Sequence, residues 1–158
     1  MKGDTKVLAA LNDVLTGELT AINQYFLHGK MCKNWGFLKI GEKVYKESID
    51  EMKHAALLTD RILFLEGMPN LQKLGKIRIG ENVKEQLESD LALEMEAIPR
   101  LKAAIELCYT AGDHGTRDLL EKILVSEEEH ADWIETQLSV VKDIGIQNYL
   151  AQQIDSQA

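Results

Sequence analysis

Two short motifs in the chain each place a glutamate three residues before a histidine. They pair Glu51 with His54 and Glu127 with His130. On a helix, residues three apart share a face, so each motif presents a carboxylate and an imidazole side by side. Mixed carboxylate and imidazole ligation suits iron, manganese or zinc. A single motif of this kind is weak evidence, because Glu and His are common on solvated helix faces.

Two further glutamates extend the pattern to four segments of the chain. Glu18 and Glu94, like Glu51 and Glu127, fall on apolar stripes with alternating three- and four-residue spacing. One such glutamate alone is more often a rim residue that reaches water, but six residues in register are not explained that way. No Lys or Arg lies on these stripes, and an unpaired buried carboxylate is costly. Two divalent cations would balance the four negative charges, and a paired site with four carboxylates favours iron or manganese. The predicted ligands are Glu18, Glu51, His54, Glu94, Glu127 and His130.

The same stripes predict the elements that position these residues. Four amphipathic helices are expected over about residues 4–35, 38–66, 82–111 and 116–144, with a short fifth helix over 146–154. The connections 36–41 and 112–115 are short, so the helices they join should be antiparallel. Residues 67–80, extended, cover about 45 Å, enough to pass a helix of about 42 Å. The sequence therefore predicts an all-α, antiparallel four-helix bundle with one long crossover between helices two and three, as one domain covering 1–158.

Composition narrows the class of protein further. The 158 residues carry 18 Lys+Arg against 26 Asp+Glu, a net charge of −8 that argues against a nucleic-acid binder. No apolar run approaches the ~20 residues that a membrane span requires. Cys32 and Cys108 form neither a CxxC pair nor a disulfide framework, and no signal-peptide pattern follows Met1. We therefore expect a reduced, cytoplasmic protein.

Several stretches of the chain resemble the bacterioferritins, the haem-containing bacterial branch of the ferritins. The resemblance covers essentially all residues and implies a ferritin-like fold. The stretches that carry it are MKGD at 1–4, LTAINQYFLH at 19–28, DEMKHA at 50–55, RILFLEG at 61–67, PNL at 69–71, SEEEH at 126–130 and QNYL at 147–150.

The resemblance implies that the chain is a ferroxidase that stores iron. Its six predicted ligands would form a di-iron centre, in which Glu51 and Glu127 bridge the irons. Glu18 with His54, and Glu94 with His130, would complete the two ends. Fe(II) would be oxidised by O₂ or H₂O₂, and the ferric mineral would be stored inside a hollow shell of 24 subunits. Tyr25 resembles the family's tyrosine beside this centre, although a core aromatic with a hydrogen-bonded hydroxyl is an equal alternative.

Met52 is the residue specific to this branch of the ferritins. Its spacing places it beside the inward stripe, on a face shared with Tyr45, Ile49 and Ala56, where a methionine ordinarily packs in an interface. The resemblance implies instead that Met52 is the axial ligand of haem b, with one methionine from each of two subunits across a twofold axis. No CxxCH motif is present, so the haem would be held without covalent attachment.

The resemblance also implies partners, and two positions depart from it. The shell would be a homo-oligomer or would also include a second bacterioferritin subunit type. A small ferredoxin would reduce the stored iron. Lys46 replaces a histidine of the inner-surface iron site of some members, which puts such a site on Glu47 and Asp50 in doubt. Pro99, five residues after Glu94, should kink the third helix. Apolar crossover residues would either pack or receive the ferredoxin: Met68, Leu71, Leu74, Ile77 and Ile79.

Two other functions are consistent with parts of the pattern. A di-metal oxygenase or a rubrerythrin-like peroxidase would use similar ligands, but these usually have longer chains or a rubredoxin module with paired CxxC motifs, which this sequence lacks. A non-catalytic haem-binding or structural shell subunit, working beside a catalytic partner, is the second alternative.

Overall fold

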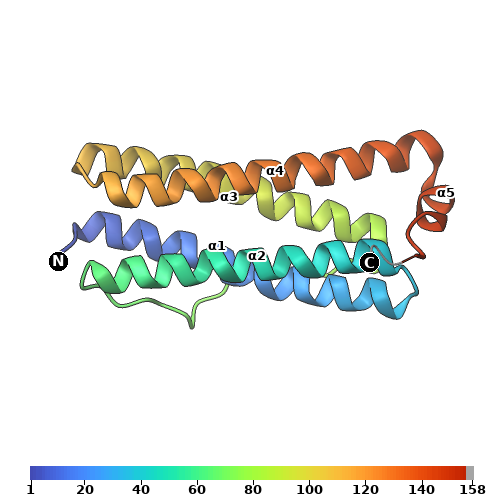
Figure 1. Ribbon diagram of the computed structural model, residues 1–158, viewed down its shortest axis with the longest axis horizontal. Helices are drawn as coiled ribbons and strands as arrows, with labels where there is room; N and C mark the ends of the chain where they lie inside the picture. Colours follow the sequence, from blue (N-terminus) through green and yellow to red (C-terminus); the bar gives the residue numbers. More distant parts are fainter. Residues whose placement is uncertain (156–158) are drawn as a thin grey trace.

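The computed structural model describes residues 1–155, which fold into five helices and contain no strand. The first two long helices form one antiparallel hairpin and the next two form another, and a non-helical crossover over residues 65–82 joins them (Figure 1). The second and third helices run in the same direction, which confirms the predicted ferritin-like topology. The helices are α1 (Thr5–Asn34), α2 (Leu38–Phe64), α3 (Val83–Ala111), α4 (His114–Ile144) and α5 (Ile146–Ala151).

The predicted bounds differ from the observed ones by two or more residues at three helix ends. The connection expected over 112–115 is shorter, because Asp113 caps α4: its Oδ1 accepts from the backbone N–H of Thr116 at 3.0 Å, and the helix begins at His114. α2 ends at Phe64, before Glu66, whose φ of 63° is left-handed. α5 ends at Ala151 and not at residue 154. Pro99 is exposed and α3 continues through it.

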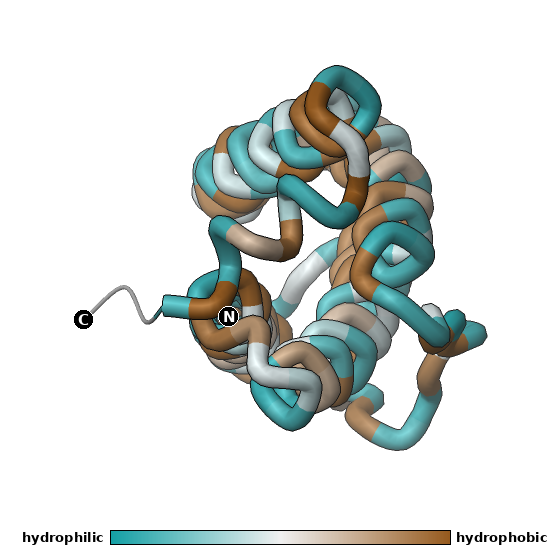
Figure 2. The backbone as a smooth tube through the Cα atoms, turned by 90° about the vertical axis from the view of Figure 1, so that its right-hand side faces the viewer, coloured by the Kyte–Doolittle hydropathy of each residue, from teal (hydrophilic) through white to brown (hydrophobic). Residues whose placement is uncertain are grey.

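Two apolar clusters fill the bundle and leave a polar layer between them. One lies where α1 and α4 begin and α2 and α3 end, and the other lies at the opposite end. Viewed along the bundle, the four long helices surround one axis with the crossover outside them (Figure 2). Burying one Leu or Ile contributes about 1.5–3 kcal/mol, so the clusters hold the helices in register around the polar layer. Fully buried members are Leu11, Leu58 and Leu120 in the first cluster and Ile40, Leu87 and Ile134 in the second.

A ladder of polar side chains on α1 fixes the crossover along the outside of the bundle. Each side chain accepts a hydrogen bond from a crossover backbone N–H that has no partner in a helix or sheet. The pairs are Asn70 N–H to Asn12 Oδ1 at 2.8 Å, Gly75 to Thr20 Oγ1 at 2.8 Å, Arg78 to Gln24 Oε1 at 2.9 Å and Gly80 to His28 Nε2 at 3.1 Å. The crossover is therefore an ordered part of the fold.

Helices α1 and α2 are in close backbone contact at a pair of glycines. A Cβ on Gly29 would lie 2.9 Å from the backbone nitrogen of Tyr45, and a Cβ on Gly41 would lie 3.1 Å from the carbonyl oxygen of Gly29. Both glycines are buried. Backbone atoms cannot move aside as a flexible side chain can, so this contact needs glycine on both helices. None of the helices within residues 1–155 combines the length and the apolar character needed to cross a membrane.

We predict that Gly29→Ala destabilises the fold by about 1–3 kcal/mol, because the added methyl group forces the α1 and α2 backbones apart. The matched control is Gly17→Ala on the same helix, whose new Cβ would meet only the tip of the Arg100 side chain. That control should be neutral or up to about 1 kcal/mol more stable, since alanine favours a helix interior. Chemical denaturation followed by circular dichroism measures both. Equal effects of the two substitutions would contradict the role given to the Gly29 contact.

Candidate metal centre

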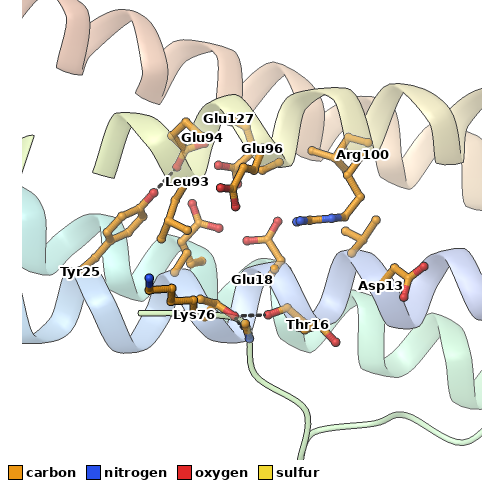
Figure 3. Close-up of a pocket in the computed structure, with 18 of the residues that line it drawn as sticks. Asp13, Thr16, Glu18, Tyr25, Lys76, Leu93, Glu94, Glu96, Arg100 and Glu127 are labelled. Atoms are coloured by element: carbon orange, nitrogen blue, oxygen red, sulfur yellow. Dashed lines mark hydrogen bonds between the residues drawn. The ribbon is translucent and has the colours of Figure 1, made fainter. Parts of the chain in front are cut away.

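The six predicted ligands come together at mid-height of the bundle. Each long helix contributes one glutamate, and the two histidines lie one turn after the glutamates of α2 and α4. Figure 3 shows Glu18, Glu94 and Glu127 directed toward one another between the helices. The glutamates Glu18, Glu51, Glu94 and Glu127 are each no more than 4% exposed. The polar layer between the two apolar clusters is therefore built chiefly from carboxylates.

These side chains form two overlapping groups of possible metal ligands. In each group, one ligand atom from every residue lies within 4.8 Å of the others. Both groups contain Glu51 and Glu127, while Glu18 and His54 belong only to one and Glu94 and His130 only to the other: the groups are Glu18, Glu51, His54, Glu127 and Glu51, Glu94, Glu127, His130. The arrangement is that of two adjacent sites that share two carboxylates.

The imidazole of His54 lies among the carboxylates of the first group. Its Nδ1 is 3.1 Å from Glu127 Oε1, 3.3 Å from Glu51 Oε2 and 3.7 Å from Glu18 Oε2. Burial alone would lower the pKa of His54, but its hydrogen bonds with Glu127 and Glu51 outweigh that effect and raise the pKa to about 10. In the metal-free protein, a proton on His54 therefore occupies the position between the carboxylate oxygens that a metal ion would take.

The second group is organised around Glu94. Its Oε1 accepts a hydrogen bond from the hydroxyl of Tyr25 at 2.5 Å and lies 2.9 Å from Nδ1 of His130. Burial, as the main cause, raises the pKa of Glu94 to about 8. The pKa of His130 rises to about 9, because hydrogen bonding to Glu94 and the nearby carboxylates outweigh burial. Burial also raises the pKa of Glu127. Protons thus supply the positive charge that the buried acids need.

The other oxygen of Glu94 tests whether the site suits a metal. Glu94 Oε2 is buried and is the one such side-chain oxygen or nitrogen within residues 1–155 that lacks a hydrogen-bond partner. An unsatisfied buried carboxylate oxygen is costly, and a cation would satisfy it. Carboxylate oxygens with imidazole nitrogens are donors that iron and manganese accept. The residues present therefore fit a pair of divalent ions.

Sequence reasoning did not predict that two buried acids lie beside the centre, although it considered Glu47 for an inner-surface site. Glu47 is buried, pairs with Lys43 Nζ at 2.7 Å and lies 3.8 Å from Nε2 of His130. Asp90 is buried and accepts from Gln24 Nε2 and pairs with His28 Nδ1, both at 2.8 Å. A signal existed, because each acid lies four residues before a predicted ligand and so shares its helix face. The partners of Asp90 could not be read from the sequence, because they come from α1, whereas Lys43 and Glu47 form an i,i+4 pair within α2.

The remaining predicted positions lie at the surface of α2 or at its edge. Met52 is 59% exposed and Ile49 37% exposed, so the thioether is directed away from the carboxylates and is free for an interface. Lys46 is exposed, and Asp50 lies 4.0 Å from Lys53 Nζ. With Glu47 held by Lys43 and Asp50 facing Lys53, the expectation against an inner-surface metal site stays a prediction.

Comparisons with known proteins agree with this geometry. A family model described as a ferritin-like domain matches residues 8–144. The chain is similar to the bacterioferritin of Mycobacterium leprae, with 52% identity over 152 residues that cover 96% of each chain. It is 45% identical over 155 residues to the bacterioferritin of Streptomyces coelicolor, covering 98% of this chain and 93% of the relative. The bacterioferritin of Brucella melitensis is 46% identical over 149 residues, covering 94% of this chain and 92% of the relative.

We predict that the metal-free protein becomes less stable as the pH rises above neutrality. The pKa values of His54 and His130 are 6.5 in the unfolded chain and about 10 and about 9 in the folded protein. Their contribution to the free energy of unfolding is therefore fully present below pH 6.5 and is lost as the pH rises through the folded values. The raised pKa of Glu94, from 4.5 to about 8, acts in the same direction. The unfolding free energy should fall by at least about 1 kcal/mol across this range. Urea denaturation at several pH values measures it, and a flat or rising profile contradicts the prediction.

Proposed function

This chain belongs to the bacterioferritin family, whose function is iron storage, and from that premise we propose that it oxidises Fe(II) at the six-residue centre. The proposal includes storage of the ferric product inside a hollow shell of 24 subunits. The observation that supports it best is the sharing of Glu51 and Glu127 by two four-residue ligand groups. Shared carboxylates keep two ions adjacent, and the charge of two divalent ions cancels that of the four glutamates.

Two Fe(II) ions held at adjacent sites would supply two electrons for each reaction. Two Fe(II) reduce one H₂O₂ to two waters, or one O₂ to H₂O₂, with two protons consumed in either case, and both irons become Fe(III). Adjacent irons deliver both electrons to one oxidant, which avoids release of a one-electron radical. Binding of iron requires the protons at Nδ1 of His54 and Nδ1 of His130 to leave, since a protonated nitrogen cannot ligate.

Neighbouring residues orient the ligands of the second group. The hydroxyl of Tyr25 donates to Glu94 Oε1 and so limits which way that carboxylate turns. His130 stacks on Trp133, with ring centroids 6.3 Å apart and planes at 21°, and its Nε2 faces Glu47. When Nδ1 ligates a metal, a carboxylate near the other ring nitrogen favours the tautomer that leaves Nδ1 free. The apolar clusters above and below the centre exclude bulk water from it along the bundle axis.

The proposal extends to haem b, which supplies an electron-transfer route when it is bound. The exposed thioether of Met52, with Ile49 beside it on the same helix, fits a ligand shared with a second subunit across a twofold axis. A small ferredoxin is the proposed reductant in the cytoplasm. Support for its docking near the crossover comes from exposed apolar residues there, Met68 at 81% and Leu71 at 54%. A second bacterioferritin subunit type is compatible with the same shell.

If the chain were a structural, non-catalytic subunit, we would not expect it to keep the buried acids of the centre. A subunit without ferroxidase activity has no need for four buried carboxylates, and burial of so many acids lowers stability unless they bind cations. All six ligand positions are present here and adjacent. Oxidation kinetics decide between the two functions.

We predict that Glu127→Gln abolishes rapid Fe(II) oxidation, lowering its rate at least about tenfold, because both ligand groups lose a shared carboxylate. The matched control is Glu129→Gln in the same motif, since Glu129 is exposed. The purified assembly is loaded anaerobically with Fe(II), mixed with O₂ or H₂O₂, and followed by ferric absorbance. A normal rate in Glu127→Gln, or no rapid phase in the unaltered protein, would falsify the proposed reaction.

Haem binding at Met52 gives a separate prediction. Met52→Leu keeps the apolar volume but removes the thioether, so the purified assembly should lose the visible haem bands while its size on gel filtration stays unchanged. Met95→Leu is the control, because Met95 is also an exposed methionine, 45% exposed, on α3. Haem bands that persist in Met52→Leu, or that disappear equally in Met95→Leu, contradict the assignment.

A further inference from the structure

A cavity of about 250 Å³ leads from the surface to the carboxylates of the centre. It lies between α1, α3 and the crossover, and its inner wall contains Tyr25 and all four glutamates of the centre. Figure 3 shows Tyr25, Glu18, Glu94 and Glu127 together with charged side chains such as Asp13, Lys76 and Arg100. The charged residues outside the centre are Asp13, Lys73, Lys76, Glu96 and Arg100.

Arg100 is the basic residue of this set that lies against the α1 backbone. Figure 3 shows its guanidinium extending from α3 toward Glu18. A Cβ on Gly17 would lie 2.3 Å from Arg100 Nη1, so the guanidinium occupies the space that the missing side chain of Gly17 leaves, next to Glu18 in the sequence. Arg100 is half-buried, and within residues 1–155 it makes no ion pair or side-chain hydrogen bond. No ion pair therefore holds the guanidinium, and the acid that it extends toward, Glu18, belongs to the centre itself.

The outer part of the cavity has more free cations than free acids. Glu96 is paired with Arg78 at 2.9 Å, which leaves Asp13 as its unpaired acid in the part of the chain that the structure describes. Lys73 and Lys76, both exposed on the crossover, have no ion pair over the same residues. Three unpaired basic side chains thus face one unpaired carboxylate along the way to the centre. This excess of unpaired cations in the outer part of the cavity opposes the approach of a cation from outside.

We infer that this cavity admits the uncharged oxidant to the centre and that Arg100 is a specificity-determining residue that keeps divalent cations from entering this way. The inference rests on the proposed function, because it assigns a route to one of its two substrates. O₂ and H₂O₂ carry no net charge and meet no barrier from the guanidinium. A divalent ion passing a single positive charge at about 7 Å, in surroundings close to water, is opposed by enough energy to slow it about tenfold.

The test uses Co(II), which takes carboxylate and imidazole ligands and reports on binding by its visible absorbance without any oxidation. Stopped-flow mixing of Co(II) with the metal-free assembly should give an association rate about tenfold higher in Arg100→Gln than in the unaltered protein. The matched control, Lys102→Gln, removes an exposed cation of the same helix that does not line the cavity and should leave the rate unchanged. In anaerobically iron-loaded protein, the rate of reaction with H₂O₂ should be the same in all three proteins within twofold.

The outcomes separate this inference from the proposed function. If two Co(II) do not bind per subunit even in the unaltered protein, the di-metal centre itself fails. If Co(II) binds but Arg100→Gln leaves its association rate unchanged or slower, the cavity does not exclude cations and the inference is overturned. A tenfold increase in Lys102→Gln as well, or a slower H₂O₂ reaction in Arg100→Gln, also overturns it, because the effect would then be general or would act on the oxidant.

Discussion

Four carboxylates buried at the same height of a narrow bundle impose the condition that the rest of this structure must meet. Such a layer persists only with positive charge inside it, and without metal that charge is protons on His54, His130 and Glu94. The apolar clusters on both sides supply the stability that keeps the layer closed. In the proposed function, two divalent ions would supply the positive charge that protons supply in the metal-free protein.

Much of the centre could be predicted because its ligands follow helical periodicity. The apolar stripes predict which face each helix buries, and the Glu on each stripe, with His three residues later on two of them, predicts which polar side chains meet there. The lengths of the connections predict the topology. Two local contacts were open to sequence reasoning but were not read from it: the cap of α4 by Asp113 and the pairing of Lys43 with Glu47. Contacts set by other elements were not predictable. Asp90 shares a ligand face, yet its partners Gln24 and His28 come from α1.

Arg100 illustrates why the periodic pattern is insufficient for access to the site. No basic residue lies on the stripes, and among residues 1–155 no Lys or Arg is fully buried. The cation that bears on access comes from the flank of α3 and reaches the cavity because Gly17 leaves room on α1. The missing side chain of Gly17 on α1 thus allows the charge of Arg100 on α3 to take its position. The apolar stripe of either helix alone does not reveal this contact.

The polar ladder on α1 has a consequence for how the chain can change in length. Its acceptors recur at whole helical turns, at Thr20, Gln24 and His28, while the donors come from a segment with no regular repeat. Deleting one residue between Gly75 and Gly80 would offset each later donor from its acceptor by a full peptide unit. Variation in length is therefore expected to concentrate near residues 71–74, where no backbone donor is held by α1, and swapping the segment between homologues requires exchanging the matching face of α1 with it.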